Sequence, residues 1–394
     1  MQIHMTRIFG IIMSISLLMI LVTKLTFRSH SCSTFMLSED SILLVGHNLD
    51  GPQWRWRQEP GSVFINKKNT YKRSVSGYEL GALEKQQIIE WISEYGSVTF
   101  NGFGREFPDG GMNEAGLVIN EMGYGYKDYS YNDSLPTMMV TQWIQYQLDN
   151  FATVEEVIKN INNINIVHWG LPAPIGGNNW HFFLTDKDAN MAIIEFVKGE
   201  LKIYTGNSAP IPVLCNREYK TDIEKIKRFR GFGGKRKIIL KPKLLAYWFN
   251  QGASLVNNYD LEKNGDPVTY GFNILRTMQR PKSEQWSIIY DVKRSRVYFR
   301  TFFASDIRYF DLSSFDFNTK EVKILPDIHV NYSGDVTKYF VPYTYQFNCK
   351  IIEKSLSEFL EAYKKLYTFE NTGSTPEMYI EKRKKLVLRV IMEE

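Results

Sequence analysis

The sequence predicts an α+β domain in which helices cover antiparallel sheets. Strand-like runs come in groups joined by short turn-forming stretches, and segments with the apolar spacing of amphipathic helices lie between them. A hydrophobic content of 43% is enough for a large core. We find no repeat and no long linker within residues 32–394, and we expect this part of the chain to form a single domain.

Strand patterns occur in three places. Residues 33–50 (STFMLSEDSILLVGHNLD) contain two apolar runs separated by Ser-Glu-Asp, which predicts a hairpin with Cys32 at the free end of its first strand. Residues 181–205 contain three runs joined by Asp-Lys-Asp-Ala-Asn and by Lys-Gly, and residues 285–303 contain another ladder. The hairpin at residues 33–50 would hold the Cys32 thiol on a sheet.

Helical periodicity separates these strand groups. It predicts helices in residues 138–151, 153–164, 243–251 and 351–367, with Thr153 as the N-cap of the second. Because hairpins alternate with these helical segments, the helices are expected to cover the faces of the sheets.

The first 31 residues differ from the rest. One positive charge precedes the apolar stretch at residues 8–22, as in a secretory signal peptide, and the stretch is short for a membrane span. Ser29 and Ser31 stand at positions −3 and −1 relative to Cys32, as a cleavage site requires. We expect export to the periplasm or the extracellular space, no stable membrane insertion after cleavage, and Cys32 as the new first residue. The alternative is an uncleaved N-terminal membrane anchor.

Charge and motifs exclude several function classes. The 48 basic and 43 acidic residues are interspersed, and the densest basic run, residues 225–237, is best explained as a solvated face. We therefore expect no nucleic-acid partner. The six histidines lack the spacing of a metal-binding helix, and Gly-Phe-Gly-Gly-Lys lacks that of a phosphate loop. Neither a metal nor a cofactor is expected; the expected partner is a small molecule, and a homo-oligomer is compatible with the sequence.

Three cysteines are too few for a disulfide scaffold: Cys32, Cys215 and Cys349. The last two could pair or remain buried thiols. Cys32 differs because cleavage before it would leave a thiol nucleophile and an α-amine on one residue. An α-amine has an ordinary pKa of about 7.7–8.0, so it can act as a general base without a separate histidine.

The sequence resembles the choloylglycine hydrolase and penicillin V acylase family, which are N-terminal-nucleophile hydrolases of linear amides. The resemblance rests on Cys32-Ser33-Thr34, Gly46–Asp50 (GHNLD) and residues 95–119 (YGSVTFNGFGREFPDGGMNEAGLVI), and continues through residues 145–158, 212–219 and 285–291. It implies a four-layer αββα sandwich with the nucleophile at the start of a central strand. It covers nearly all of residues 32–394.

The resemblance implies roles for individual residues. Cys32 would be the nucleophile and its amine the base, with Asp50 orienting that amine. Asn216, in Val-Leu-Cys-Asn, would supply a side-chain amide to the oxyanion hole. The second oxyanion donor would be a backbone N–H at Gly123, with Tyr124 as the alternative.

Two positions depart from the family pattern. His47 stands where many members have an arginine, and we expect partial protonation near neutrality to make activity depend on pH. Lys241 would replace a second arginine, with Arg228 and Arg236 as alternatives.

The resemblance therefore implies an exported acylase that hydrolyses a linear amide. Penicillin V-like or N-acyl amides are expected rather than bile salts. Four aromatic residues near the expected pocket would suit an apolar acyl or aryl group and are equally compatible with ordinary core or surface positions: Trp54, Trp56, Tyr124 and Tyr126. The alternative is a binding protein on the same fold, secreted or tethered to a membrane, whose catalysis is weakened by His47 and Lys241.

Overall fold

The computed structural model describes most of the chain after residue 31. The described residues are 32–39, 41–50, 61–74, 88–102, 104–124, 129, 132, 134–167, 179–240, 248–279, 284–364, 375, 377, 378 and 381; for 124, 179, 284 and 356–364 only the backbone is described. The proposed signal peptide, residues 1–31, lies outside them. Among the described helices, none has the length and apolar character needed to cross a membrane.

The first sheet carries Cys32 at the start of one of its strands. Its order in space is β14 (Val213–Cys215), β1 (Ser33–Glu39), β2 (Ile42–Asp50), β15 (Glu284–Asp291), β16 (Arg296–Thr301), β17 (Arg308–Asp311) and β19 (Gly334–Asp335). Pairing is antiparallel except between β17 and β19. The predicted hairpin of residues 33–50 is confirmed, since β1 and β2 pair along the whole length of β1.

The second sheet faces the first and is also antiparallel. Its order is β13 (Glu200–Thr205), β12 (Met191–Val197), β11 (Asn179–Thr185), β8 (Val118–Tyr124), β7 (Gly110–Asn113), β6 (Ser97–Asn101), β3 (Ser62–Asn66), β18 (Lys323–Leu325) and β20 (Val341–Pro342). Two further ladders join β9 (Thr137–Met139) to β10 (Asn165–Val167) and β4 (Tyr71–Arg73) to β5 (Glu90–Ile92).

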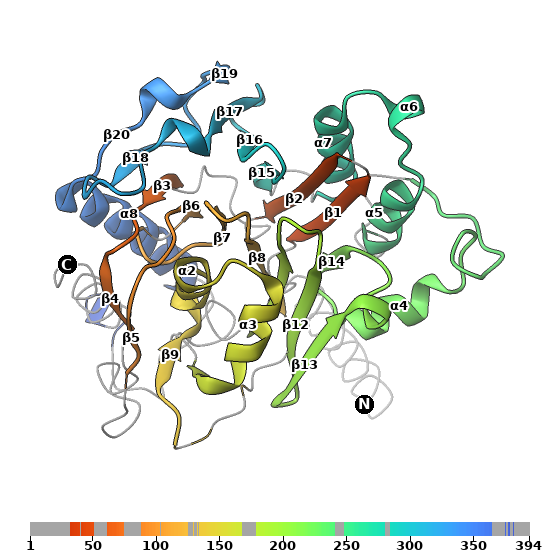
Figure 1. Ribbon diagram of the computed structural model, residues 1–394, viewed down its shortest axis with the longest axis horizontal. Coiled ribbons are helices and arrows are strands. Elements are labelled where there is room, and N and C mark those ends of the chain that lie inside the picture. Colours follow the sequence, from red (N-terminus) through yellow and green to blue (C-terminus); the bar gives the residue numbers. More distant parts are fainter. Residues whose placement is uncertain are drawn as a thin grey trace, which may run out of the picture.

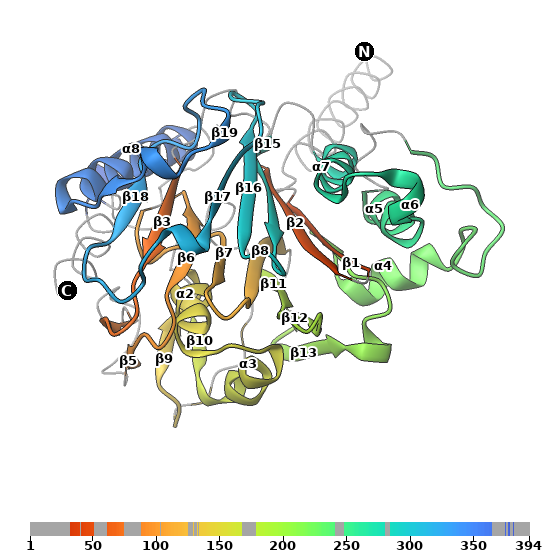
Figure 2. The same cartoon turned by 45° about the horizontal axis from the view of Figure 1, so that its top comes forward.

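Helices cover the outer face of each sheet. The described helices are α2 (Val140–Asn150), α3 (Val154–Asn160), α4 (Tyr219–Ile226), α5 (Trp248–Asn257), α6 (Leu261–Asn264), α7 (Pro267–Met278) and α8 (Tyr345–Lys364), with 3-10 turns at Ile161–Asn163, Gly206–Ser208, Leu312–Ser314 and Thr337–Tyr339. Helices α5 and α7 pack on β1, β2, β14 and β15, and α2 packs on β7 and β8 (Figures 1 and 2). The result is the predicted four-layer αββα arrangement.

The two faces of β1 bury different layers. Phe35 points toward α7, because its ring lies close to Gly46 and Gly271, where a Cβ atom would meet it. Met36 points the other way and accepts a hydrogen bond from Thr185 of the second sheet at 3.7 Å. Alternation along the strand therefore turns Cys32 and Thr34, which share parity with Met36, toward the space between the sheets.

The helix predictions are correct in place but not always in extent, and residues 243–247 and 365–367 of the predicted helices lie outside the described residues. Residues 138 and 139 belong to β9, so α2 begins at Val140. Thr153 caps α3 through a complete capping box with Glu156. Helix α5 runs on to Asn257, beyond the predicted end at residue 251, and α8 begins at Tyr345, ahead of residue 351. Helices α4, α6 and α7 were not predicted.

All three cysteines carry free thiols, so the alternative of a bond between Cys215 and Cys349 is not realised in the structure. Cys32 and Cys215 are buried and Cys349 is half-buried. The core is therefore held by apolar burial and by polar contacts, as the low cysteine count predicts.

Candidate active site

Cys32 occupies a position fixed by strands on both sides. Ser33 is opposite Cys215 of β14 and opposite Asn48 of β2. One step toward the N-terminus, the same registers bring Cys32 beside Asn216 on one side and Leu49 on the other. The side chain of Cys32 is almost completely buried, with an exposed fraction of 1%. The site thus forms where β1 starts and β2 and β14 end.

Asn216 and Gly123, predicted to work together, are in direct contact. The side-chain Nδ2 of Asn216 donates to the backbone carbonyl of Gly123 at 2.7 Å. Asn216 follows β14 of the first sheet, whereas Gly123 lies on β8 of the second, so this hydrogen bond joins the sheets next to Cys32. One hydrogen of the amide is used in this way, and the other can serve a bound group.

Asp50, the last residue of β2, is also beside Cys32. It is fully buried, and its backbone N–H hydrogen-bonds to the thiol, which favours the thiolate. Its carboxylate acts in the opposite sense, because its negative charge raises the pKa of Cys32. A carboxylate at this position can also accept a hydrogen bond from an α-amine on Cys32, as its predicted role requires.

Burial and acidic neighbours keep the Cys32 thiol protonated. Loss of solvation raises its pKa well above the ordinary value, and the charges of Glu121, Asp50 and Asp109 raise it further. Glu121 on β8 is itself buried, and burial followed by the charge of Asp109 raises the pKa of its carboxyl group. A thiolate here must be formed by transferring the proton to a nearby base.

His47 lies on the same sheet face as Cys32 but is neutral. It stands opposite Thr34, whose hydroxyl contacts its Nδ1 at 2.9 Å, and it is fully buried. Burial lowers the pKa of the imidazole to about 3, although the Ser33 carbonyl opposes the shift. The expectation that His47 is partly protonated near neutrality is therefore wrong, because desolvation of the charged form outweighs its hydrogen bonds.

Not all predicted site residues can be placed. Lys241 lies outside the described residues, as do Trp54, Trp56 and Tyr126, and only the backbone of Tyr124 is described. The alternatives to Lys241, Arg228 and Arg236, are exposed on a surface segment where the backbone N–H of Arg236 donates to the carbonyl of Arg228. Neither of these two arginines is brought to Cys32.

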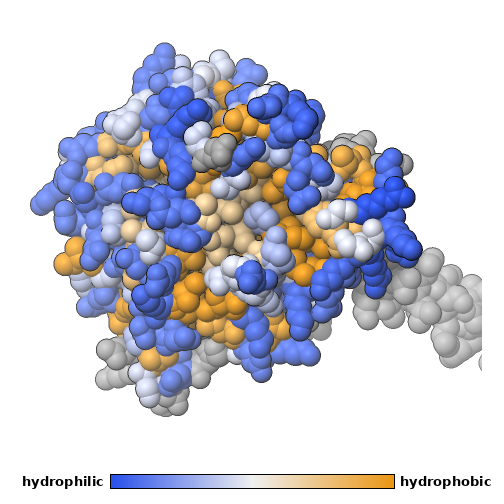
Figure 3. Space-filling model, turned by 45° about the vertical axis from the view of Figure 1, so that its right-hand side comes forward, coloured by the Kyte–Doolittle hydropathy of each residue, from blue (hydrophilic) through white to orange (hydrophobic). Residues whose placement is uncertain are grey.

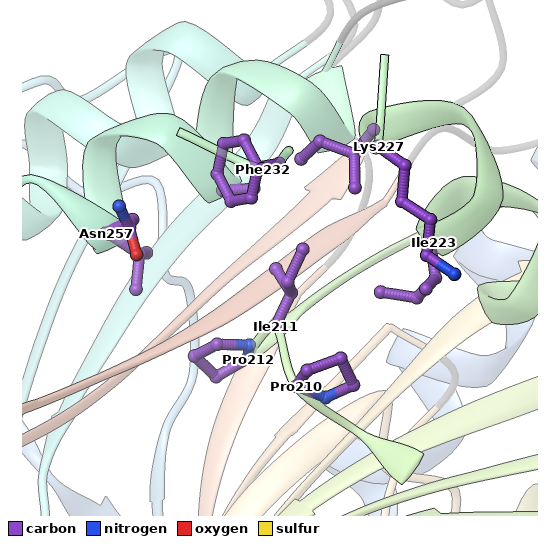
Figure 4. Close-up of a pocket in the computed structure, with 10 residues that line it drawn as sticks. Pro210, Ile211, Pro212, Ile223, Lys227, Phe232 and Asn257 are labelled. Atoms are coloured by element: carbon purple, nitrogen blue, oxygen red, sulfur yellow. The ribbon is translucent and has the colours of Figure 1, made fainter. Parts of the chain in front are cut away.

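Two hollows lie away from this site, on either side of residues 210–212, which lead into β14. One, of about 290 Å³, is walled by Pro210, Ile211 and Pro212 and by side chains from α4 and α5 (Figure 4). The other, of about 640 Å³, lies between Met36, α3 and the ends of β12 and β13. The hollows of about 290 Å³ and about 640 Å³ are both at the end of β14 remote from Asn216.

Figure 3 shows one face of the molecule. A hollow lies near its centre, and apolar side chains gather around it inside a hydrophilic surround.

Within the described ranges, no group of histidine, cysteine and carboxylate side chains could hold a metal ion. The chemical groups brought together are instead a buried thiol, a side-chain amide and strand-end backbone groups. This set fits nucleophilic attack on a carbonyl carbon with stabilisation of the resulting oxyanion.

Fold and site thus fit a hydrolase of amide bonds. The family model of the linear amide C–N hydrolases, choloylglycine hydrolase family, matches residues 32–241, more than half of the chain. The chain belongs to this family and is an amidohydrolase.

Individual relatives give the same result. A penicillin V acylase of Pectobacterium atrosepticum is 24% identical over 297 residues, covering 65% of this chain and 78% of that protein. A bile salt hydrolase/transferase of Lactiplantibacillus plantarum is 35% identical over 107 residues, covering 27% of this chain and 32% of that protein.

Solved structures support the fold. Penicillin V acylase from Agrobacterium tumefaciens superposes with a TM-score of 0.65 at 22% identity, covering 79% of this chain and 98% of that one. A variant of conjugated bile acid hydrolase from Clostridium perfringens gives a TM-score of 0.59 at 20% identity, covering 74% and 96%.

Sequence analysis missed the buried acids near the site. Glu121 and Glu195 each interrupt a run of strand residues that are otherwise apolar or uncharged, in Val-Ile-Asn-Glu-Met and Ile-Ile-Glu-Phe. A charged residue inside a buried strand costs free energy unless it has partners. This signal is present in the sequence, but the role of each buried acid depends on which residues the fold brings close to it.

We expect His47 to make the fold sensitive to acid. Its pKa is about 6.5 when unfolded and about 3 when folded, so protons bind preferentially to the unfolded chain and stability falls as pH drops from 6.5 toward 3. In the His47→Gln variant the free energy of unfolding, measured by denaturant titration at several pH values, should fall less steeply over this window. Between pH 6.5 and pH 3, the wild type should lose more free energy of unfolding than the variant, by on the order of a few kcal/mol.

Thr34→Val is the matched control, because it removes the partner of His47 Nδ1 without removing the titrating group. Its stability should follow the wild-type pH dependence at a lower level. Parallel curves for wild type and His47→Gln would show that His47 is not the group that resists protonation.

Proposed function

We propose that the mature protein begins at Cys32 and hydrolyses linear amides with the Cys32 thiolate as nucleophile and its own α-amine as base. The observation that carries the proposal is the placement of Cys32 beside Asn216, whose amide is held by Gly123 at 2.7 Å. The family match beginning at residue 32 supports the same first residue. In the sequence as given, Cys32 follows Ser31 and its nitrogen is a peptide amide, so removal of residues 1–31 by export is part of the proposal.

The reaction proceeds in two halves. The thiol proton passes to the α-amine, which Asp50 orients, and the sulfur attacks the carbonyl carbon of the substrate. The negative oxygen of the tetrahedral intermediate accepts hydrogen bonds from Asn216 Nδ2 and from a strand-end backbone N–H at Gly123, with Tyr124 as the alternative. The ammonium protonates the leaving nitrogen, the C–N bond breaks, and a thioester forms. Water, deprotonated by the same amine, then cleaves the thioester and releases the acid.

The proposed substrate is a penicillin V-like or other N-acyl amide. The support comes from the extent of the matches: the penicillin V acylase is matched over 78% of its length, and the bile salt hydrolase/transferase over 32%. Expected localisation is periplasmic or extracellular. The alternative is a binding protein on the same fold, weakened as a catalyst because neutral His47 supplies no positive charge on the sheet face that carries Cys32.

Export should yield a protein that starts at Cys32. Ser29 and Ser31 frame the cleavage site, and the mechanism needs a free α-amine. Intact-mass measurement of the exported protein should give the mass of residues 32–394. An active species that retains Met1 or begins after Cys32 would contradict the mechanism.

Replacing the nucleophile should abolish hydrolysis without unfolding the protein. Cys32→Ala removes one small buried side chain, so the variant should fold, yet penicillin V, an N-acyl homoserine lactone and a glycine-conjugated bile salt should all remain uncleaved. Cys215→Ala is the control, because Cys215 is also buried on the adjacent strand but is not proposed to react. Turnover by folded Cys32→Ala, or its loss in folded Cys215→Ala, would show that the nucleophile is misassigned.

Loss of the oxyanion amide should slow the chemical step. Asn216→Ala is expected to lower kcat by about 10²–10³-fold on the best substrate of that panel, with KM changed much less. Steady-state kinetics at matched folded concentration provide the measurement. A rise in KM at constant kcat would identify Asn216 as a residue that only binds substrate.

A further inference from the structure

A buried histidine–carboxylate pair lies on the second sheet, near the site but outside it. His181 of β11 and Glu195 of β12 are opposite each other, with Nδ1 and Oε1 separated by 2.8 Å. Both side chains are completely buried. Burying a carboxylate is costly unless several donors satisfy it, so the partners of Glu195 show what it holds in place.

Glu195 also reaches a residue outside its own sheet. The backbone N–H of Tyr219, the first residue of α4, donates to both carboxylate oxygens, at 3.0 Å to Oε1 and 3.2 Å to Oε2. Tyr219 follows Asn216 by only three residues, and Figure 1 shows α4 near the ends of β13 and β14. The second sheet therefore holds the segment that leaves β14.

The Tyr219 side chain holds the other end of the same segment. Its hydroxyl donates to the carbonyl of Ile211 at 2.8 Å and accepts from the N–H of Ile211 at 3.1 Å. Figure 4 shows Ile211 between Pro210 and Pro212 on the wall of the smaller hollow. Residues 211–219 thus form a loop that the hydrogen bonds between Tyr219 and Ile211 close. The loop contains β14 and Asn216, and Glu195 holds Tyr219 in place.

Both residues of the Asn216–Gly123 contact are thus connected to neighbouring strands of the second sheet. Gly123 lies on β8 opposite Trp180, and the next residue along β11 is His181, which contacts Glu195 on β12. We propose that Glu195, oriented by His181, is a positioning residue that sets the place of the Asn216 amide relative to Gly123 and Cys32. The inference rests on the proposed function, because it takes Asn216 as the oxyanion donor.

The expected effect is kinetic as well as structural. An oxyanion donor works only if it lies within hydrogen-bond distance of the developing charge, and a displacement of about 1 Å can cost about 10²-fold in rate. Without Glu195, β14 keeps its ladder with β1, and Tyr219 keeps its bonds to Ile211. The loop should therefore remain folded but lose its attachment to β12, which leaves the Asn216 amide held to the second sheet by the Gly123 contact.

The first test compares Glu195→Ala with Asp149→Ala. Asp149 is an equally buried carboxylate on α2 whose partners lie on other elements than those of Glu195. It accepts from Trp91 of β5 and Gln145 of α2 at 2.8 Å each and pairs with Lys72 of β4 at 3.1 Å. At equal folded concentration, Glu195→Ala should lower kcat by about 10–100-fold with KM within about threefold. Asp149→Ala should lose stability while its kcat per folded molecule stays within about threefold. Glu195→Gln, which keeps an acceptor oxygen for Tyr219, should recover most of the lost kcat.

The decisive test is a double-mutant cycle with Asn216→Ala. If Glu195 acts through Asn216, kcat of the double variant should be no lower than that of Asn216→Ala alone, because the amide that Glu195 positions is already absent. Multiplicative losses, or a kcat for Glu195→Ala equal to that of the Asp149→Ala control, would overturn the inference. Should Glu195→Ala not fold, Glu195→Asp enters the same cycle, since its shorter side chain withdraws the carboxylate from the Tyr219 N–H and keeps the charge.

The same assay separates this inference from the proposed function. Activity in Cys32→Ala would reject the nucleophile whatever Glu195 does. An inactive Cys32→Ala together with a fully active Glu195→Ala would reject only the positioning role.

Discussion

The pairing of β1 with two antiparallel neighbours is the constraint on which the site depends. Its register with β14 brings Asn216 beside Cys32, and its register with β2 brings His47 opposite Thr34 and ends β2 near the thiol at Asp50. Side chains alternate along a strand, so a slip of one residue would turn Cys32 away from the space between the sheets. The close fit of the Phe35 ring against Gly46 opposes such a slip, because any other residue at position 46 would meet the ring.

The electrostatics of the site explain why the proposed base must be local. Burial and three carboxylates hold the proton on Cys32, and the imidazole that replaces the family arginine carries no charge to offset them. A separate base would also need a charge stabilised in this buried region. An α-amine on Cys32 avoids that requirement, since the proton moves within one residue and the resulting ammonium is next to the carboxylate of Asp50. The carboxylate of Asp50 would thus stabilise the ammonium that forms during attack, while its charge disfavours the thiolate.

Much of the fold was predictable because its signals are local. The hairpin of residues 33–50 shows alternating apolar runs around a turn, and Thr153 with Glu156 forms a capping box that sequence alone indicates. Helix α7 was not predicted, although Asp266 caps it and Pro267 occupies its first turn. Cys32, Asp50, Asn216 and Gly123 were predicted as site residues from the family resemblance, and the structure brings Asn216 into contact with Gly123. The charge state of His47 was misjudged. A sequence gives the residue type at a position, but the degree of desolvation that sets its pKa depends on strands far away in the chain.

The positions of the reacting groups come from different parts of the fold. The proposed nucleophile, Cys32, belongs to the first sheet, and in the proposed mechanism its activation depends on a free amine. The proposed oxyanion donors bridge both sheets: Gly123 belongs to the second, and Asn216, although it follows a strand of the first, is tied to the second through Gly123 and, by way of Tyr219, through Glu195. In the proposed mechanism, removing the segment before Cys32 creates the base without moving the donors, because β1, β2 and β14 already fix Cys32 beside Asn216. Conversely, a change in the contact between the sheets would displace the donors and leave the thiol and its amine intact. In the proposed mechanism, activation of the nucleophile depends on processing and stabilisation of the oxyanion depends on packing between the sheets, so the two are separable.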